Sequence, residues 1–173
     1  MELTADANLV LLILRVVTGL GRAAHGWNKF FRGGRIAGTG RWFDSIGMRP
    51  GRLNAYLAAG TEVGAGTMLA LGLLNPLAAA GVIGVMTVAC WTVHLRNGYF
   101  ILKEGWEYVF AIGVMALVSA TLGPGEWSVD SALGIAGELD GWTGFWIALL
   151  AGVGGGMLQL AAFYRPSSVQ RAD

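Results

Sequence analysis

The chain has 173 residues, the length of one domain, of which 54% are hydrophobic and only 13% charged. Soluble domains carry roughly twice that share of charged residues, so this composition and the mean hydropathy of +0.56 predict an integral membrane protein. The net charge of +1 argues against a nucleic-acid-binding protein, and the single cysteine, Cys90, excludes an internal disulfide, a dithiol and a multi-cysteine metal site.

The first apolar segment, residues 9–30, is predicted to stay in the mature protein as a transmembrane helix. Glu2 and Asp6 stand where a cleavable signal has basic residues, and Arg15 and Arg22 interrupt the apolar run. A membrane span needs about 20 mostly apolar residues. Four further stretches qualify, at residues 55–74, 76–95, 107–122 and 142–163. Asn75-Pro76 predicts a tight turn, so the second and third spans should form an antiparallel hairpin.

Basic residues separate completely between the two sets of loops. Ten of the 12 flank the same ends of the spans, and the other two lie within the first span: the ten are Lys29, Arg32, Arg35, Arg41, Arg49, Arg52, Arg96, Lys103, Arg165 and Arg171. The opposite set carries only acids: Glu2, Asp6, Glu126, Asp130, Glu138 and Asp140. Because Lys and Arg accumulate in cytoplasmic loops, we expect a multi-pass protein of the cell inner membrane. Its N-terminus would be outside and its C-terminus cytoplasmic.

Residues 31–54 combine apolar and basic side chains. Ile36, Trp42, Phe43 and Ile46 recur at roughly helical spacing, with arginines between them. A short amphipathic helix in the inner interface would place the apolar face among acyl chains and the arginines among anionic headgroups. The alternative is an ordinary basic loop.

A polar stripe runs along the first span. Arg15, Thr18, Arg22, His25 and Lys29 are spaced three or four residues apart, which places all five on one helix face. Ionisable groups at membrane depth usually face the bundle interior. The stripe could be catalytic, or it could hold helices together. Lys29 lies near enough to the helix end to extend its amine to the interface, whereas Arg22 lies too deep.

Arg22 and Glu62 are predicted to form a buried ion pair. At a rise of ~1.5 Å per residue, Arg22 lies about 20 Å below the outer edge of the first span. Glu62 lies about 10 Å above the inner edge of a ~30 Å core, at the same level. The pair could be functional or purely structural.

Further polar residues gather in the cytoplasmic half of the predicted bundle. His25 and His94 lie near the inner ends of the first and third spans, and Glu104, Glu107 and Tyr108 open the fourth on one face. Such a set could bind a metal, relay protons to a redox cofactor, or form a hydrogen-bonded cluster. Neither H-x-x-H nor E-x-x-H occurs among them, so we assign no metal site.

The fifth span is a packing helix by its composition. Ala148, Gly152 and Gly156 recur every fourth residue, and such faces allow close backbone approach. The helix could pack on its own bundle or on a partner protein.

Several motifs resemble the DoxX/DoxD family of membrane proteins over residues 9–125. They are A-H-G-W-N-K-F-F (24–31), G-T-G-R-W-F (38–43), E-V-G-A-G beginning at Glu62, H-L-R-N-G-Y-F (94–100) and G-W-E-Y (105–108). The resemblance implies a four-helix membrane bundle. It also implies a quinone-linked or thiol-redox subunit, because the family includes the quinone-reducing membrane subunit of archaeal thiosulfate:quinone oxidoreductase. An actinobacterial DoxX protein is associated with a superoxide dismutase and a sulfurtransferase in an oxidative-stress complex.

The sequence therefore predicts an all-α, polytopic membrane protein: a DoxX-like four-helix transmembrane bundle plus a fifth C-terminal transmembrane helix. Residues 1–125 would form the bundle, including the basic segment 31–54. Residues 126–173 would add an acidic external loop, the fifth helix and a short cytoplasmic tail, and this addition suggests a protein partner.

The favoured function is a membrane subunit linked to quinone or oxidative-stress redox chemistry. A polar pocket would bind the cofactor, which we expect to be a quinone, and its residues would be Arg22, His25, Glu62, His94, Glu107 and Tyr108. Protonatable groups are present, but no haem or flavin motif is, so electrons would come from a bound cofactor or a partner. Whether the chain is itself an enzyme stays open. The alternatives are a non-catalytic subunit that scaffolds a larger complex and, third, a small-molecule transporter.

Overall fold

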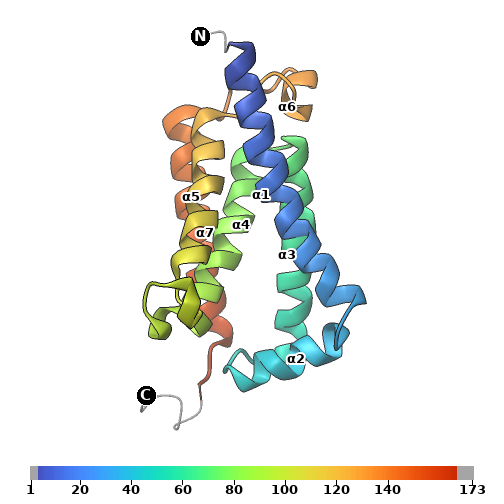
Figure 1. The fold of residues 1–173 in the computed structure, drawn as a ribbon, viewed down its shortest axis with the longest axis vertical. Helices are drawn as coiled ribbons and strands as arrows, with labels where there is room; N and C mark the ends of the chain where they lie inside the picture. The colour runs from blue at the N-terminus through green and yellow to red at the C-terminus, as the bar shows by residue number, and fades with distance from the viewer. Residues whose placement is uncertain (1–3, 167–173) are drawn as a thin grey trace.

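The computed structural model describes residues 4–166, and every regular element in that range is a helix. Five long helices run along the long axis of the molecule (Figure 1). They are α1 (Ala5–Phe31), α3 (Gly51–Leu71), α4 (Asn75–Ala89), α5 (Glu107–Leu122) and α7 (Gly141–Phe163). Two shorter helices, α2 (Arg35–Ser45) and α6 (Val129–Ala132), lie at opposite ends. The predicted all-α class is confirmed.

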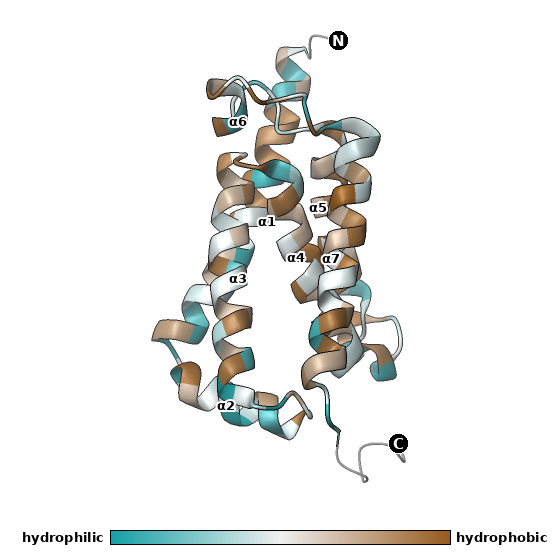
Figure 2. Cartoon of the chain, turned by 180° about the vertical axis from the view of Figure 1, so that it is seen from behind, coloured by the Kyte–Doolittle hydropathy of each residue, from teal (hydrophilic) through white to brown (hydrophobic). Residues whose placement is uncertain are grey.

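Length and hydropathy separate the long helices into two groups. Three helical segments are long and apolar enough to cross a membrane: Ala5–Phe31 (α1), Asn75–Asn97 (α4 with the short helical turns that follow it) and Gly141–Phe163 (α7). The helix α5 is strongly apolar but has only 16 residues. The helix α3 is 21 residues long and rich in small residues, with Glu62 inside it. Both lie in the same bundle as the three apolar helices (Figure 2), which confirms a polytopic membrane protein.

Local signals in the sequence set the ends of several helices. The hydroxyl of Thr4 caps α1 by accepting a hydrogen bond from the N–H of Ala7 at 3.3 Å. Gly72 ends α3 in the left-handed conformation, with φ of 64°, and Pro76 lies in the first turn of α4. The hairpin of the second and third spans is therefore confirmed, with its turn between Leu71 and Asn75.

Glycines allow the helices to approach closely. A Cβ on Gly26 of α1 would lie 2.6 Å from the carbonyl oxygen of Ala59 in α3, so these two helices touch through their backbones. On the other side of the bundle, Gly152 and Gly156 of α7 lie against Ile83 and Thr87 of α4 in the same way. The small-residue face of α7 thus packs on its own bundle, which answers the question that the sequence left open.

The two ends of the bundle differ in charge. At the end that carries α2, called the α2 end here, α1 and α4 finish and α3 and α5 begin; the loops there hold the basic residues. The opposite end, called the α6 end, holds Asp6, Glu126, Asp130, Glu138 and Asp140. Glu2 and Arg171, which also entered the charge pattern, lie outside the described residues.

The segment 31–54 contains the predicted helix, but its apolar face points elsewhere than expected. Ile36 and Phe43 are buried in a cluster with Met48, Ala55 and Leu160, so α2 packs its apolar face on the bundle and not among acyl chains. Asp44 accepts a hydrogen bond from the N–H of Gly51 at 2.8 Å, which ties α2 to the start of α3. The helix closes the α2 end of the bundle.

Candidate functional site

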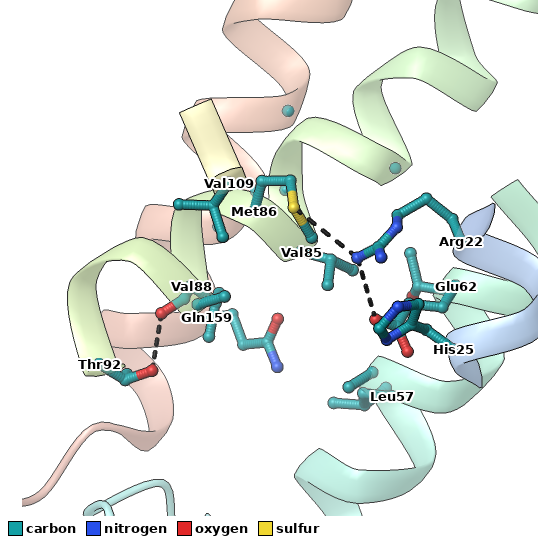
Figure 3. A pocket seen from close by; sticks show the side chains of 18 of the residues that line it. Arg22, His25, Leu57, Glu62, Val85, Met86, Val88, Thr92, Val109 and Gln159 are labelled. Carbon is teal, nitrogen blue, oxygen red and sulfur yellow. Dashed lines mark hydrogen bonds and ion pairs between the residues drawn. The ribbon is translucent and has the colours of Figure 1, made fainter. Parts of the chain in front are cut away.

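A cavity of about 560 Å³ lies in the half of the bundle nearest the α2 end. Side chains from α1, α2, α3, α4, α5 and α7 line it, and most of them are apolar or glycine. The helix α4 forms one wall with Val85, Met86 and Val88, while α1 and α3 form the facing wall (Figure 3). A cavity of this size, apolar with a few polar groups, is typical of small-molecule sites.

The facing wall carries a buried ionic cluster. Arg22 Nη1 lies 3.8 Å from Glu62 Oε1, and the side chains of both residues are only 5% exposed. The predicted pair is confirmed. Lys29 Nζ pairs with Glu62 Oε2, so the prediction that Lys29 extends to the interface was wrong. Lys29 lies in the last turn of α1, and its amine turns back to the buried carboxylate, so Glu62 faces two cations.

Arg22 reaches from α1 across to α4 and α5. Its Nη2 donates to the hydroxyl of Tyr108 at 3.3 Å, its Nη1 lies 3.9 Å from the sulfur of Met86, and its guanidinium lies 5.8 Å from the centre of the Tyr108 ring. A thioether sulfur is a weak acceptor, and guanidinium has five N–H donors in a planar fork. Arg22 therefore presents a positive charge and hydrogen-bond donors to an apolar cavity (Figure 3).

Two histidines join this site from different helices. His25 lies on the α1 wall beside Glu62, and His94 lies at the end of a π-helical turn, Cys90–His94, that follows α4. The Nδ1 of His94 is 2.6 Å from the carbonyl oxygen of Glu104. Because a carbonyl only accepts, Nδ1 carries the proton there, and Nε2 is left for another partner. Single π-helical turns often occur at functional sites.

The structure brings together five of the six predicted pocket residues. Arg22, His25, Glu62, His94 and Tyr108 all line the cavity. Glu107 lies outside it, because its carboxylate accepts a hydrogen bond from the N–H of Ile101 at 2.9 Å and so fixes the loop before α5. The helical spacing of Glu107 and Tyr108 places them on adjacent positions of the first turn, and only Tyr108 points to the cavity.

The sequence analysis did not single out some of the lining residues. Gln159 of α7 lines the cavity and donates to Asn54 Oδ1 of α3 at 3.1 Å, and Gly155 of α7 lies nearby. Trp42 and Phe43 of α2 line the end of the cavity. Gln159 is a polar residue in an otherwise apolar helix, which is the signal that could have singled it out. The contribution of α2 depends on its tertiary placement.

The polar residues at the α6 end form a separate network that does not line this cavity. Arg15 is 1% exposed and donates to the carbonyl oxygens of Ala70, at 2.9 Å, and Trp127, at 2.8 Å. The carboxylate of Asp130 accepts the N–H groups of Leu74 and Asn75 at 2.8 and 3.0 Å. The polar stripe of α1 is therefore divided between two sites. Arg15 belongs to this network, whereas Arg22, His25 and Lys29 line the cavity.

No group of three or more His, Cys, Asp or Glu side chains within residues 4–166 is arranged to hold a metal ion. In the cavity, Glu62 faces two cations rather than other ligands. The chemistry that the lining supplies is hydrogen bonding, positive charge and proton exchange.

These features define a class: an all-α polytopic membrane protein with a polar-walled cavity in one half of its helical bundle. The chain belongs to the DoxX family, which it matches over residues 10–95. That range covers α1 to α4 and includes Arg22, His25, Glu62 and His94. An uncharacterized protein of Haemophilus influenzae (strain ATCC 51907 / DSM 11121 / KW20 / Rd) is 26% identical over 114 residues, which cover 61% of this chain and 76% of that protein. No solved structure matches.

Proposed function

We propose that the cavity binds the headgroup of a membrane quinone and that the protein is the membrane subunit of a redox system. The observation that carries the proposal is Arg22, a 4%-exposed cation that faces an apolar cavity with a hydroxyl and a sulfur as its hydrogen-bond acceptors. A quinone offers two carbonyl oxygens on an apolar ring, which match this donor in this setting. The family resemblance supports the same ligand class.

The residues around Arg22 suit the proton side of quinone reduction. Reduction of a quinone to a quinol consumes two electrons and two protons. Imidazole is the most common proton-transfer group in enzymes, and His25 and His94 both lie at the cavity, so each could deliver a proton to a carbonyl oxygen. Arg22 would hold the same oxygen as negative charge develops on it. The electrons would come from a partner protein or a bound cofactor, and the chain would belong to a larger complex.

Quinone binding tests the proposal. Titration of the solubilised protein with a decyl-tailed benzoquinone should quench tryptophan fluorescence, because Trp42 lines the cavity. His25→Ala and His94→Ala should each weaken binding by roughly tenfold, the loss of about one good hydrogen bond. Glu107→Gln is the matched control, since this residue lies outside the cavity, and it should leave the affinity unchanged. Equal affinities in all variants, or no binding by the wild type, would reject the proposal and favour a scaffolding role.

We also propose that the α2 end faces the cytoplasm of the cell inner membrane. The support is the separation of basic loops at the α2 end from acidic loops at the α6 end. Single cysteines placed at Glu126 and Arg49 in a Cys90→Ala background should react oppositely with an impermeant thiol reagent on intact cells. We expect labelling at position 126 and none at position 49; the reverse pattern would invert the orientation.

A further inference from the structure

Apart from Trp42 of α2, the exposed residues of the cavity lining fall into two groups on opposite sides of α4. One group consists of His25 of α1 and Tyr108 of α5 and is polar. The other lies on α3 and α7 and is mainly apolar: Leu57, Thr61, Ala151 and Gly155. The residues that α4 contributes are all buried or partly buried. The cavity therefore opens on two sides, and the two openings differ in chemistry.

The opening between α3 and α7 faces sideways, towards the hydrocarbon of the bilayer. The α2 end below it is closed: Gln159 donates to Asn54, Arg49 N–H donates to the carbonyl oxygen of Phe163 at 2.8 Å, and α2 lies across the end (Figure 2). Beyond this closure, a Cβ built on Gly155 meets no atom within 4 Å, and Leu57 opposite is 41% exposed. An apolar chain could pass between the two helices at this level.

Resting on the proposed function, we infer that the ligand is a lipid-borne quinone whose tail lies between α3 and α7 while its headgroup faces Arg22. The ligand then enters from the membrane and not from water. The apolar wall of α4, with Val85 and Val88, would contact the ring and the first part of the tail. Burial of about 0.8 kcal/mol per methylene makes such a tail a large part of the affinity.

A pair of glycines in α7 allows a direct test. Gly155 lines the cavity, whereas Gly154 does not, and a Cβ on either residue meets nothing within 4 Å. Leucine at either position should therefore fold equally well, but only Gly155→Leu fills the opening. Each variant is titrated with two ligands, a decyl-tailed benzoquinone and the same headgroup without a tail. Leu57→Trp fills the opening from the α3 side and serves as a second variant.

We expect Gly155→Leu and Leu57→Trp to weaken binding of the tailed quinone by roughly tenfold, the equivalent of about two buried methylene groups. Binding of the tail-free headgroup should change less than about twofold, and Gly154→Leu should bind both ligands as the wild type does. An equal loss for both ligands, or no loss for either, would overturn the assignment of the tail to this opening and leave the headgroup site standing. Failure of the wild type to bind either ligand would overturn the proposed function itself.

Discussion

The two ends of this bundle bury polar side chains in opposite ways. At the α6 end, Arg15, Asn75, Ser119 and Asp130 are each at most 5% exposed, and they bond backbone groups of other elements or one another. Near the α2 end, Arg22 and Glu62 are as deeply buried, but they line a cavity of about 560 Å³. The residues of the first network do not line this cavity, whereas those of the second border its unfilled space.

This difference separates a structural role from a binding role. Asp130 draws the loop between α5 and α7 onto the turn between α3 and α4, because its two oxygens hold the N–H groups of Leu74 and Asn75. Such a network stabilises one arrangement of helices. Arg22 instead keeps donors directed at a space that a ligand can enter. The depth and the charge of a buried side chain do not distinguish a structural role from a binding role. Whether the side chain borders a cavity does.

The largest effect is expected from breaking the ionic cluster of the cavity. Glu62→Gln leaves Arg22 as a buried, uncompensated cation and should lower the free energy of unfolding in detergent by about 3–5 kcal/mol. Arg22→Gln should cost less, because Lys29 still compensates the charge of Glu62, and the double variant should lose less than the sum of the two. Strictly additive losses in unfolding measurements would show that the two side chains do not interact.

Variants at the α6 end are expected to lose less stability and to keep their affinity for the ligand. Asp130→Ala removes the acceptor of the buried Asn75 N–H group and should cost about 1–3 kcal/mol. Glu138→Ala, an exposed residue of the same loop region, should cost less than about 0.5 kcal/mol. Neither variant should change the affinity for a tailed quinone. A change in affinity for Asp130→Ala would mean that the two ends are coupled and would break the comparison.

The smallest effect is a pH dependence at the α6 end. Burial, together with the nearby negative charge of Asp130, raises the pKa of Asp140 above its ordinary value of 3.8, and a hydrogen bond with the backbone of Gly137 opposes the shift. A raised folded-state pKa means that the unfolded chain loses this proton first as pH rises. Stability should therefore fall as pH rises from about 4 through the raised pKa, and be unaffected by this group below that window.

Asp140→Asn isolates that contribution. The variant should show a flatter decline of stability as pH rises from about 4 through the raised pKa of Asp140, measured by thermal unfolding in the same detergent. Glu138→Gln, exposed on the same loop, should follow the wild type. An unchanged slope for Asp140→Asn would show that Asp140 titrates as an ordinary carboxyl.

Much of the fold could be predicted from hydrophobic segments. The segment 107–122 matches the bounds of α5, and 142–163 differs from α7 by one residue. The second span was placed four residues late, at 55 and not at Gly51, because Arg52 and Asn54 interrupt the apolar pattern inside the first turn of α3. The direction of the apolar face of α2 was predicted wrongly, because periodicity shows that a face exists and not what covers it.

The same reasoning from the sequence predicted only part of the site. Helix rise alone placed Arg22 and Glu62 at one level, and the structure pairs them. Helical spacing could not show that Lys29 turns back to Glu62, or that Glu107 holds its own loop, because both depend on side-chain direction. The contribution of α7 to the cavity was missed, since small residues predict close packing on one face and give no information about the space beside it.

The central claim, that the cavity near the α2 end is a ligand site, is tested most directly by native mass spectrometry of the gently solubilised protein. The wild type should retain a bound species with the mass of a membrane quinone, Asp130→Ala should retain it, and His94→Ala should lose it while remaining folded. Retention by all three proteins, or a folded wild type without any such species after addition of quinone to the membranes, would contradict the account.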